Sequence, residues 1–310
     1  MGEDDRSDPL AAALDAIVED ALLEWDRVQG EPPALLYHYT DVVGLIGICT
    51  SASLRATNLR FMNDAQELCH GWKLMRQVLA EAEAKAKGPA QVELIEELGQ
   101  IMSTPFGGYP DFYSVSFSAD GDLLSQWRGY GSDGGGYAVG FDTADLASFS
   151  AQSSGPRRVL NRVIYDEELQ LQILHRTAEA MLELFAQVEP GDPLLTTLRA
   201  QTFAALGQLV GFAFAFKDPA WAEEREWRVV RAVSDNELHG VQFRPGTGGV
   251  AVPFISIGPD GGSVGDLPIR QIVQGPTTSP DIAAESVKIL LATNGYTDVE
   301  VKPSSIPLRP

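Results

Sequence analysis

The residues of this sequence that could carry chemistry lie mainly where predicted strands begin or end. His38 stands in the stretch LLYHYTDVVGLI, where an apolar run that predicts a strand meets a helical pattern. An imidazole there can bind a ligand, move a proton or fill a core position. The stretch alone favours a core histidine. Tyr37 and Tyr39 are one residue out of phase with His38, so we expect them to point to the opposite face and serve packing.

A second candidate is the stretch DPAWAEEREWRVV. Alternation along a strand places Glu224, Glu226 and Arg228 on one face. It places Arg225 and Trp227 on the other. A buried carboxylate needs a partner, and Arg228 could supply it as a structural ion pair. The alternative is a carboxylate at the rim of a sheet, where it would stabilise developing positive charge or orient a nucleophile.

A third candidate is the stretch SVSFS, which is β-prone and alternating. Alternation puts Ser114, Ser116 and Ser118 on one face of the strand, opposite Val115 and Phe117. Three hydroxyls on one face suit either the water-facing side of an edge strand or the floor of a polar pocket. Both interpretations stay open on the sequence alone.

Two further groups have a structural and a ligand-binding interpretation. Asn63, Asp64 and Glu67 stand at the start of a predicted helix, where they could form a capping box or hold a loop against a ligand. Trp127 and Tyr130 are three residues apart, on one side of a helical turn. They could pack in the core or form a flat aromatic wall for a planar ligand.

Composition narrows the class of protein. The 310 residues carry a formal net charge of −20 and no cluster of basic residues, which argues against tight nonspecific binding to nucleic acid. Cys49 and Cys69 lack metal-ligand spacing, and we interpret both as small buried residues in a reducing compartment. The acidic start does not resemble a signal peptide, and no apolar run approaches the ~20 residues that span a bilayer. We therefore expect a cytoplasmic protein that does not enter a membrane.

The elements that must position these residues follow from periodicity and from turn signals. Strands are predicted at 34–40, 53–58, 112–118, 134–142, 157–166, 224–233, 249–254, 269–276 and 298–309. Helices are predicted at 8–29, 42–49, 67–102 with a break at KGPA, 123–131, 166–216 as a hairpin, and 279–296. Helices and strands do not alternate strictly, so the fold class is α+β. We expect an acidic tail and helix over 1–33, then a single domain over 34–310 with a helical insert at about 166–216.

Seven short segments occur along the chain in an order that indicates a known family. They are YHYT, FMNDAQE, SFS, WRGYG followed by GGYAVGFD, FK…W…EREWR, IVQGP and SSIPLR. Together they resemble the bacterial family catalogued as domain of unknown function 2971, over residues ~35–310. Many relatives have a histidine where this chain has Arg128, so no role is assigned to that position.

The family pattern is in turn similar to the ADP-ribosyltransferase fold, whose enzymes bind NAD in a cleft between two small sheets. The resemblance implies two small mixed or antiparallel sheets around a cleft, with flanking helices. It implies that His38 holds the adenosine ribose and that Glu226, as the catalytic acid, hydrogen-bonds the nicotinamide ribose. Tyr130 would stack on the nicotinamide, with Ser116 or Ser118 as a hydroxyl alternative.

On this hypothesis NAD is the substrate and no metal is needed. The other expected NAD-binding residues are Asn63, Asp64, Trp127 and Arg228. The expected activity is mono-ADP-ribosylation of a protein or nucleic acid, as in a toxin or a phage-defence effector. One alternative is a non-catalytic nucleotide-sensing module. Another is a metal-independent nuclease or nucleotide hydrolase that uses His38 and Glu226 for acid–base chemistry. The oligomeric state stays open, with the N-terminal helix as a possible contact.

Overall fold

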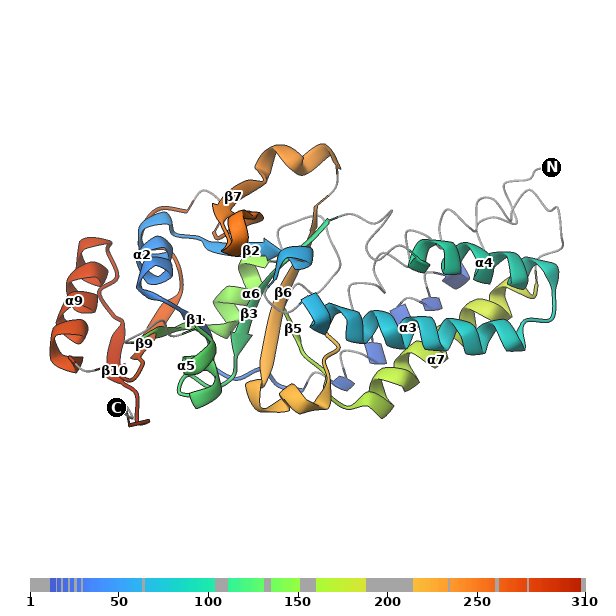
Figure 1. The fold of residues 1–310 in the computed structure, drawn as a ribbon, viewed down its shortest axis with the longest axis horizontal. Coiled ribbons are helices and arrows are strands. Elements are labelled where there is room, and N and C mark those ends of the chain that lie inside the picture. The colour runs from blue at the N-terminus through green and yellow to red at the C-terminus, as the bar shows by residue number, and fades with distance from the viewer. Residues whose placement is uncertain are drawn as a thin grey trace. The chain divides into compact units, whose positions relative to one another are not determined.

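The structure is a computed structural model of the 310-residue chain (Figure 1). It describes residues 30–62, 65–103, 111–130, 135–150, 160–187, 214–233, 235–259, 262–277 and 279–307, with separate helical residues between 12 and 28. The chain forms two compact units. The helical unit comprises 1–30, 63–111 and 164–221, and the sheet unit comprises 31–62, 112–163 and 222–310.

The sheet unit contains the strands and the shorter helices. Its strands are β1 (Leu35–Thr40), β2 (Leu54–Asn58), β3 (Asp111–Ser118), β4 (Tyr137–Asp142), β5 (Leu160–Arg162), β6 (Glu226–Val233), β7 (Gln242–Pro245), β8 (Ala251–Ile257), β9 (Ile269–Gln274) and β10 (Glu300–Pro303). Its α-helices are α2 (Val42–Ser51), α5 (Leu124–Tyr130), α6 (Thr143–Ser150) and α9 (Pro280–Thr293). Short 3₁₀ turns are η1 (Leu59–Phe61), η2 (Pro219–Glu224), η3 (Asp235–Gly240) and η4 (Thr247–Gly249).

The described strands pair into one mixed sheet, which confirms the α+β class. Neighbouring strands run β10-β9-β4-β1-β3-β2-β8-β7, and β6 pairs with both β3 and β5. The pair β10–β9 is parallel, whereas β1–β4, β4–β9 and β2–β8 are antiparallel. The resemblance implied two small sheets. The structure instead joins the strands through β3, because that eight-residue strand is long enough to pair with three neighbours.

The sheet forks along one edge of β3. Strand β1 pairs with β3 through a single residue pair, Tyr37 opposite Ser118. Strand β2 pairs with the other end of β3, where Thr57 lies opposite Ser114. The stretch of β3 between these two pairs therefore lies where β1 and β2 part.

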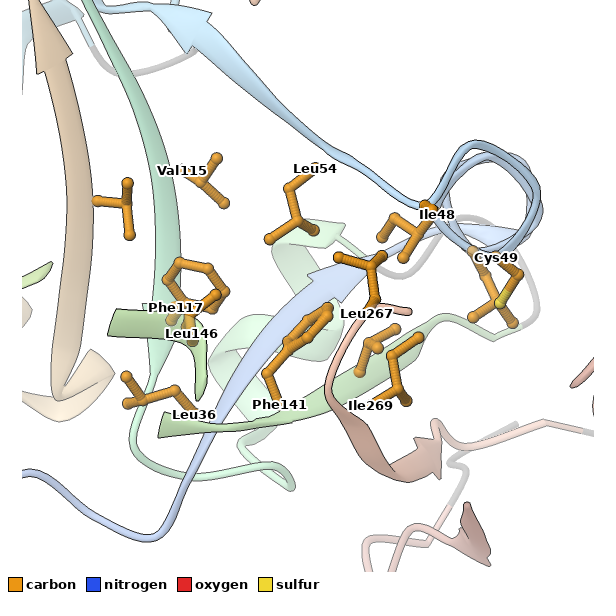
Figure 2. Packing of buried hydrophobic residues seen from close by; sticks show 14 of the residues in the cluster. Leu36, Ile48, Cys49, Leu54, Val115, Phe117, Phe141, Leu146, Leu267 and Ile269 are labelled. Carbon is orange, nitrogen blue, oxygen red and sulfur yellow. The ribbon is translucent and has the colours of Figure 1, made fainter. Parts of the chain in front are cut away.

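The main core lies on one face of this sheet. Leu36, Phe117 and Phe141 come from β1, β3 and β4, and all three are at most 2% exposed (Figure 2). Helix α2 covers them with apolar residues that include Cys49, which is fully buried. Burial raises the pKa of the Cys49 thiol to about 11, so the thiol is neutral at ordinary pH. Cys49 is therefore the small buried residue that its sequence context predicted.

Local signals place the helix ends of this unit. Asp41 caps α2 because its Oδ1 accepts a hydrogen bond from the Gly44 amide at 2.7 Å. Helix α9 begins with Pro280 in its first turn and is followed by Gly295, whose φ of 81° suits glycine. The helices predicted at 42–49 and 279–296 correspond to α2 and α9.

The helical unit contains α3 (Ala65–Lys85), α4 (Pro89–Ser103) and α7 (Glu167–Phe185). The break between α3 and α4 falls at KGPA, as predicted. Leu14 is buried in a cluster with residues of α4 and α7, and Ile17 and Val28 pack against that cluster. The N-terminal helical residues therefore serve packing. No helix in the described parts of the chain is long and apolar enough to cross a membrane.

One buried glutamine ties the helical unit together. Gln170 of α7 is fully buried, and its Nε2 donates hydrogen bonds to the backbone carbonyls of Ile164 (2.6 Å) and Lys217 (3.0 Å). Its Oε1 lies 2.9 Å from Nε2 of His70 on α3. The glutamine thus links α3, α7 and the segment before η2 through buried and half-buried polar groups.

Candidate functional site

A polar face lies on β3 and β6, on the side of the sheet away from the main core. Val115 and Phe117 of β3 point into the core, as do Trp227 and Val229 of β6. The intervening residues of these two paired strands must therefore point the other way. This surface, the serine–glutamate face, consists of Ser114, Ser116, Ser118, Glu226 and Arg228.

Two of the serines have buried hydroxyls with no hydrogen-bond partner. Ser114 is only 2% exposed, and neither its Oγ nor that of Ser116 is bonded within the described chain. Ser118 is different, because its Oγ donates to the Glu224 carbonyl at 2.8 Å and accepts from the Asp120 amide at 3.1 Å. Buried hydroxyls are normally bonded, so the unbonded hydroxyls of Ser114 and Ser116 mark this strand as a candidate site. The burial of Ser114 on a strand with three partners does not fit a water-facing edge strand, and the polar pocket floor stays a prediction.

Glu226 and Arg228 form a buried two-point ion pair. The Nε of Arg228 donates to Oε1 of Glu226 at 2.6 Å, and a terminal nitrogen donates to Oε2 at 2.8 Å. The two residues are 5% and 3% exposed. Asn161 of β5, also buried, lies opposite Arg228. The pair fixes the plane of the carboxylate, because both of its oxygens are held by one planar guanidinium.

His38 lies at the fork of the sheet. Its Nδ1 is 2.9 Å from the backbone carbonyl of Ser116, and its ring meets that of Phe117 edge-on at 5.9 Å between centroids. Burial lowers the pKa of His38, and the hydrogen bond to Ser116 opposes that shift only in part. The ring is therefore neutral near pH 7. Because a carbonyl can only accept, Nδ1 carries the proton and Nε2 is left as an acceptor.

The three expected catalytic residues do not gather in one cluster. His38 is two residues from Leu36, which points into the main core, so His38 leaves β1 on the core side. Glu226 leaves β6 on the opposite side. Tyr130 is the last residue of α5 and is 48% exposed. His38 instead contacts the backbone of Ser116, and Glu226 contacts Arg228.

The other aromatic candidate is a packing residue in this structure. Trp127 of α5 is 6% exposed and packs against Tyr39, Ala138 and Val273. The rings of Tyr39 and Trp127 meet edge-on, with centroids 4.7 Å apart. Tyr37 packs against the same cluster. The aromatic wall expected from Trp127 and Tyr130 is not formed, because the tryptophan face is covered by the sheet.

Asp122, which sequence reasoning missed, holds α5 and the C-terminal residues in place. Its Oδ1 accepts hydrogen bonds from Nε1 of Trp127 at 2.9 Å and from the Ser304 hydroxyl. Its Oδ2 accepts from the amide and the hydroxyl of Ser305, both at 2.7 Å. Burial alone would raise the pKa of Asp122, but the hydrogen bonds from Ser304, Ser305 and Trp127 outweigh it and lower the pKa.

Part of the chain, from within α5 to the start of β6, is similar to a known protein family. Residues 126–229 match the family model described as "Protein of unknown function (DUF2971)". This match confirms the predicted resemblance over residues 126–229, which are part of the ~35–310 span to which the sequence assigned it. The DUF2971 segment contains Trp127, Tyr130, Glu226 and Arg228, whereas His38 and the serines of β3 precede it. No curated protein and no solved structure matches the chain.

Two expected ligand residues cannot be placed. Asn63 and Asp64 lie outside the residues that the structure describes. Among the described residues, no group of three or more His, Cys, Asp or Glu side chains could hold a metal ion. The candidate residues that the structure describes are those of the serine–glutamate face and His38 at the fork.

Proposed function

We propose that this protein is an NAD-dependent mono-ADP-ribosyltransferase whose acceptor is a protein or a nucleic acid, as for a toxin or a phage-defence effector. One observation carries the proposal. Strands β1, β3 and β6 are consecutive neighbours, and they bear His38, the unbonded serine hydroxyls and the buried Glu226. The sequence resemblance implies a histidine on the first strand, a hydroxyl or aromatic residue in mid-chain and a glutamate on a late strand as the residues that bind NAD.

Glu226 has the environment that cleavage of the nicotinamide–ribose bond requires. That cleavage builds positive charge on the ribose, and a fixed carboxylate stabilises such charge without having to reorient. Arg228 holds both oxygens of the carboxylate through one planar guanidinium, so the carboxylate is already oriented before a ribose binds. Ser116 adds an unbonded hydroxyl on the same face.

His38 can contribute through its free acceptor. With Nδ1 bound to the Ser116 carbonyl, Nε2 is oriented to accept from a ribose hydroxyl, which suits the role expected for it. His38 and Glu226 leave the sheet on opposite sides. A single ligand contacts both side chains only if it reaches both faces of the sheet. The gap along β3 between β1 and β2 would allow this, and we propose that the dinucleotide binds there.

The test is release of nicotinamide from NAD by the purified full chain. Glu226→Gln should reduce the rate by about 10²–10³-fold, the usual cost of losing one preorganised electrostatic group. Because this change also leaves Arg228 without its charge partner, the Tm is measured alongside the rate. Glu285→Gln, an exposed change on α9, is the matched control and should leave the rate unchanged. Equal rates for Glu226→Gln and wild type, with both folded, would refute the proposal.

A second function has one observation in its favour. Both carboxylate oxygens of Glu226 are engaged by Arg228, as in a structural ion pair. A non-catalytic nucleotide-binding module would keep that pair closed. Calorimetry separates the two functions, because binding of NAD without nicotinamide release supports the binding module, and binding with release supports the transferase.

A further inference from the structure

Arg225, the residue before β6, has a backbone conformation that arginine rarely adopts. Its φ is 46°, in the left-handed region. Its amide donates to the Ala222 carbonyl at 3.3 Å, so it occupies the position that follows the short helix η2. Glycine or asparagine usually stands there, because a Cβ atom is strained in this region. Arginine at this point therefore calls for a reason beyond the turn.

Ala52 offers a comparison within the same unit. It has a φ of 48° after α2, and among the described residues it and Arg225 are the non-glycine residues with positive φ. Ala52 is 5% exposed and belongs to the main core, so burial of its methyl group accounts for a side chain at that position. Arg225 is exposed. Within the described chain its guanidinium makes no hydrogen bond or ion pair. Packing therefore does not account for Arg225.

The strained residue is held firmly at the edge of the serine–glutamate face. The Arg225 carbonyl accepts from the Ala119 amide at 3.0 Å, and the preceding carbonyl, of Glu224, accepts from the Ser118 hydroxyl at 2.8 Å. Both bonds join the turn to the end of β3. The next residue along the chain is Glu226. A cation is thus anchored one residue from the buried carboxylate, at the end of β3 where Ser118 and Ala119 lie.

We propose that Arg225 binds the diphosphate bridge of the dinucleotide substrate. This inference rests on the proposed function and adds the residue that recognises the charged part of NAD. A guanidinium presents a planar set of donors that matches phosphate oxygens. The chain carries a net charge of −20, which repels an anionic ligand, so binding of a diphosphate needs a local cation. Arg225 supplies this cation without breaking an existing contact.

Calorimetry with the full chain tests the assignment, using NAD, inorganic pyrophosphate and nicotinamide riboside as probes. Arg225→Ala keeps the strained backbone and removes the cation, and it should weaken NAD and pyrophosphate binding by about 10–100-fold. Binding of the riboside, which has no phosphate, should not change. Arg225→Lys should retain part of the affinity for NAD. Arg270→Ala on β9, another exposed arginine, is the control and should bind all three probes as wild type does.

Arg225→Gly tests the strain separately. It should lose the same affinity as Arg225→Ala while raising the Tm by about 2–4 °C, because glycine adopts positive φ without cost. A Tm equal to that of Arg225→Ala would remove the reason for singling out this residue.

The outcomes distinguish this inference from the proposed function. If wild type and Arg225→Ala bind NAD equally, Arg225 is not the diphosphate contact and the transferase proposal stands. If wild type binds pyrophosphate in an Arg225-dependent way but does not bind NAD, the anion site stands and the dinucleotide assignment fails. If wild type binds neither probe, both are refuted.

Discussion

Replacing Asp122 with alanine should loosen the C-terminal residues from α5. The carboxylate accepts four hydrogen bonds, from Trp127, Ser304 and twice from Ser305. The two bonds from Ser305 are exposed and contribute little net stability. The bonds from Trp127 and Ser304 are part-buried, and a hydrogen bond to a charged group contributes about 1.5–3 kcal/mol. We therefore expect Asp122→Ala to cost about 3 kcal/mol, with the lower end of the range used because neither bond is fully buried.

For a unit of roughly 150–250 residues, this cost corresponds to a fall in Tm of about 6–12 °C. Thermal unfolding followed by tryptophan fluorescence measures it, because Trp127 loses its bonded carboxylate. Asp122→Asn keeps the shape of the side chain and part of its acceptor capacity, so its Tm should lie between those of wild type and Asp122→Ala. Asp281→Ala, an exposed change on α9, is the control. If Asp122→Ala unfolds within 1 °C of wild type, these hydrogen bonds contribute no net stability and the reasoning is wrong.

Three further predictions follow from the pKa shifts and the buried polar groups. The pKa of Asp122 is lower in the folded state, so its contribution to stability is present above its ordinary pKa of 3.8 and is lost as the pH falls below that value. In calorimetric scans, the Tm values of wild type and Asp122→Asn should therefore converge below pH 3.8. Gln170→Leu removes the donor to two buried carbonyls and should cost about 2–4 kcal/mol in urea unfolding, whereas the exposed Gln172→Leu should cost under 0.5 kcal/mol. In a Cys69→Ser background, Cys49 should react with a thiol reagent at pH 8 only on unfolding, because burial raises its pKa to about 11; fast reaction of the folded chain would contradict this.

Most elements of the sheet unit could be predicted because their signals are local. Strand β1 and helix α2 follow from one apolar run, one cap and one helical pattern, and the predicted ends agree with the structure to within two residues. Strand β7, Gln242–Pro245, was not predicted. It is four residues long and exposed, and it is a strand only because it pairs with β8. Its existence depends on a partner that the local pattern does not reveal.

The candidate site was predictable in part for the same reason. The ion pair between Glu226 and Arg228 follows from alternation within one strand, and it was one of the alternatives drawn from the sequence. The opposite directions of His38 and Glu226 were not predictable, because they depend on which face of each strand meets the core. Asp122 was missed because its partner Ser304 is 182 residues away. A contact at that distance leaves no trace in local spacing.

The three-way pairing of β3 has a consequence for how the protein is made. Ser118 of β3 bonds the chain 106 residues further along, just before β6. A chain that leaves the ribosome from its N-terminus therefore carries β3 with one open edge until β6 has been synthesised. An unpaired strand edge recruits other chains. Slow translation between β3 and β6, or a premature stop before Glu226, should thus yield aggregates rather than a partly folded soluble fragment.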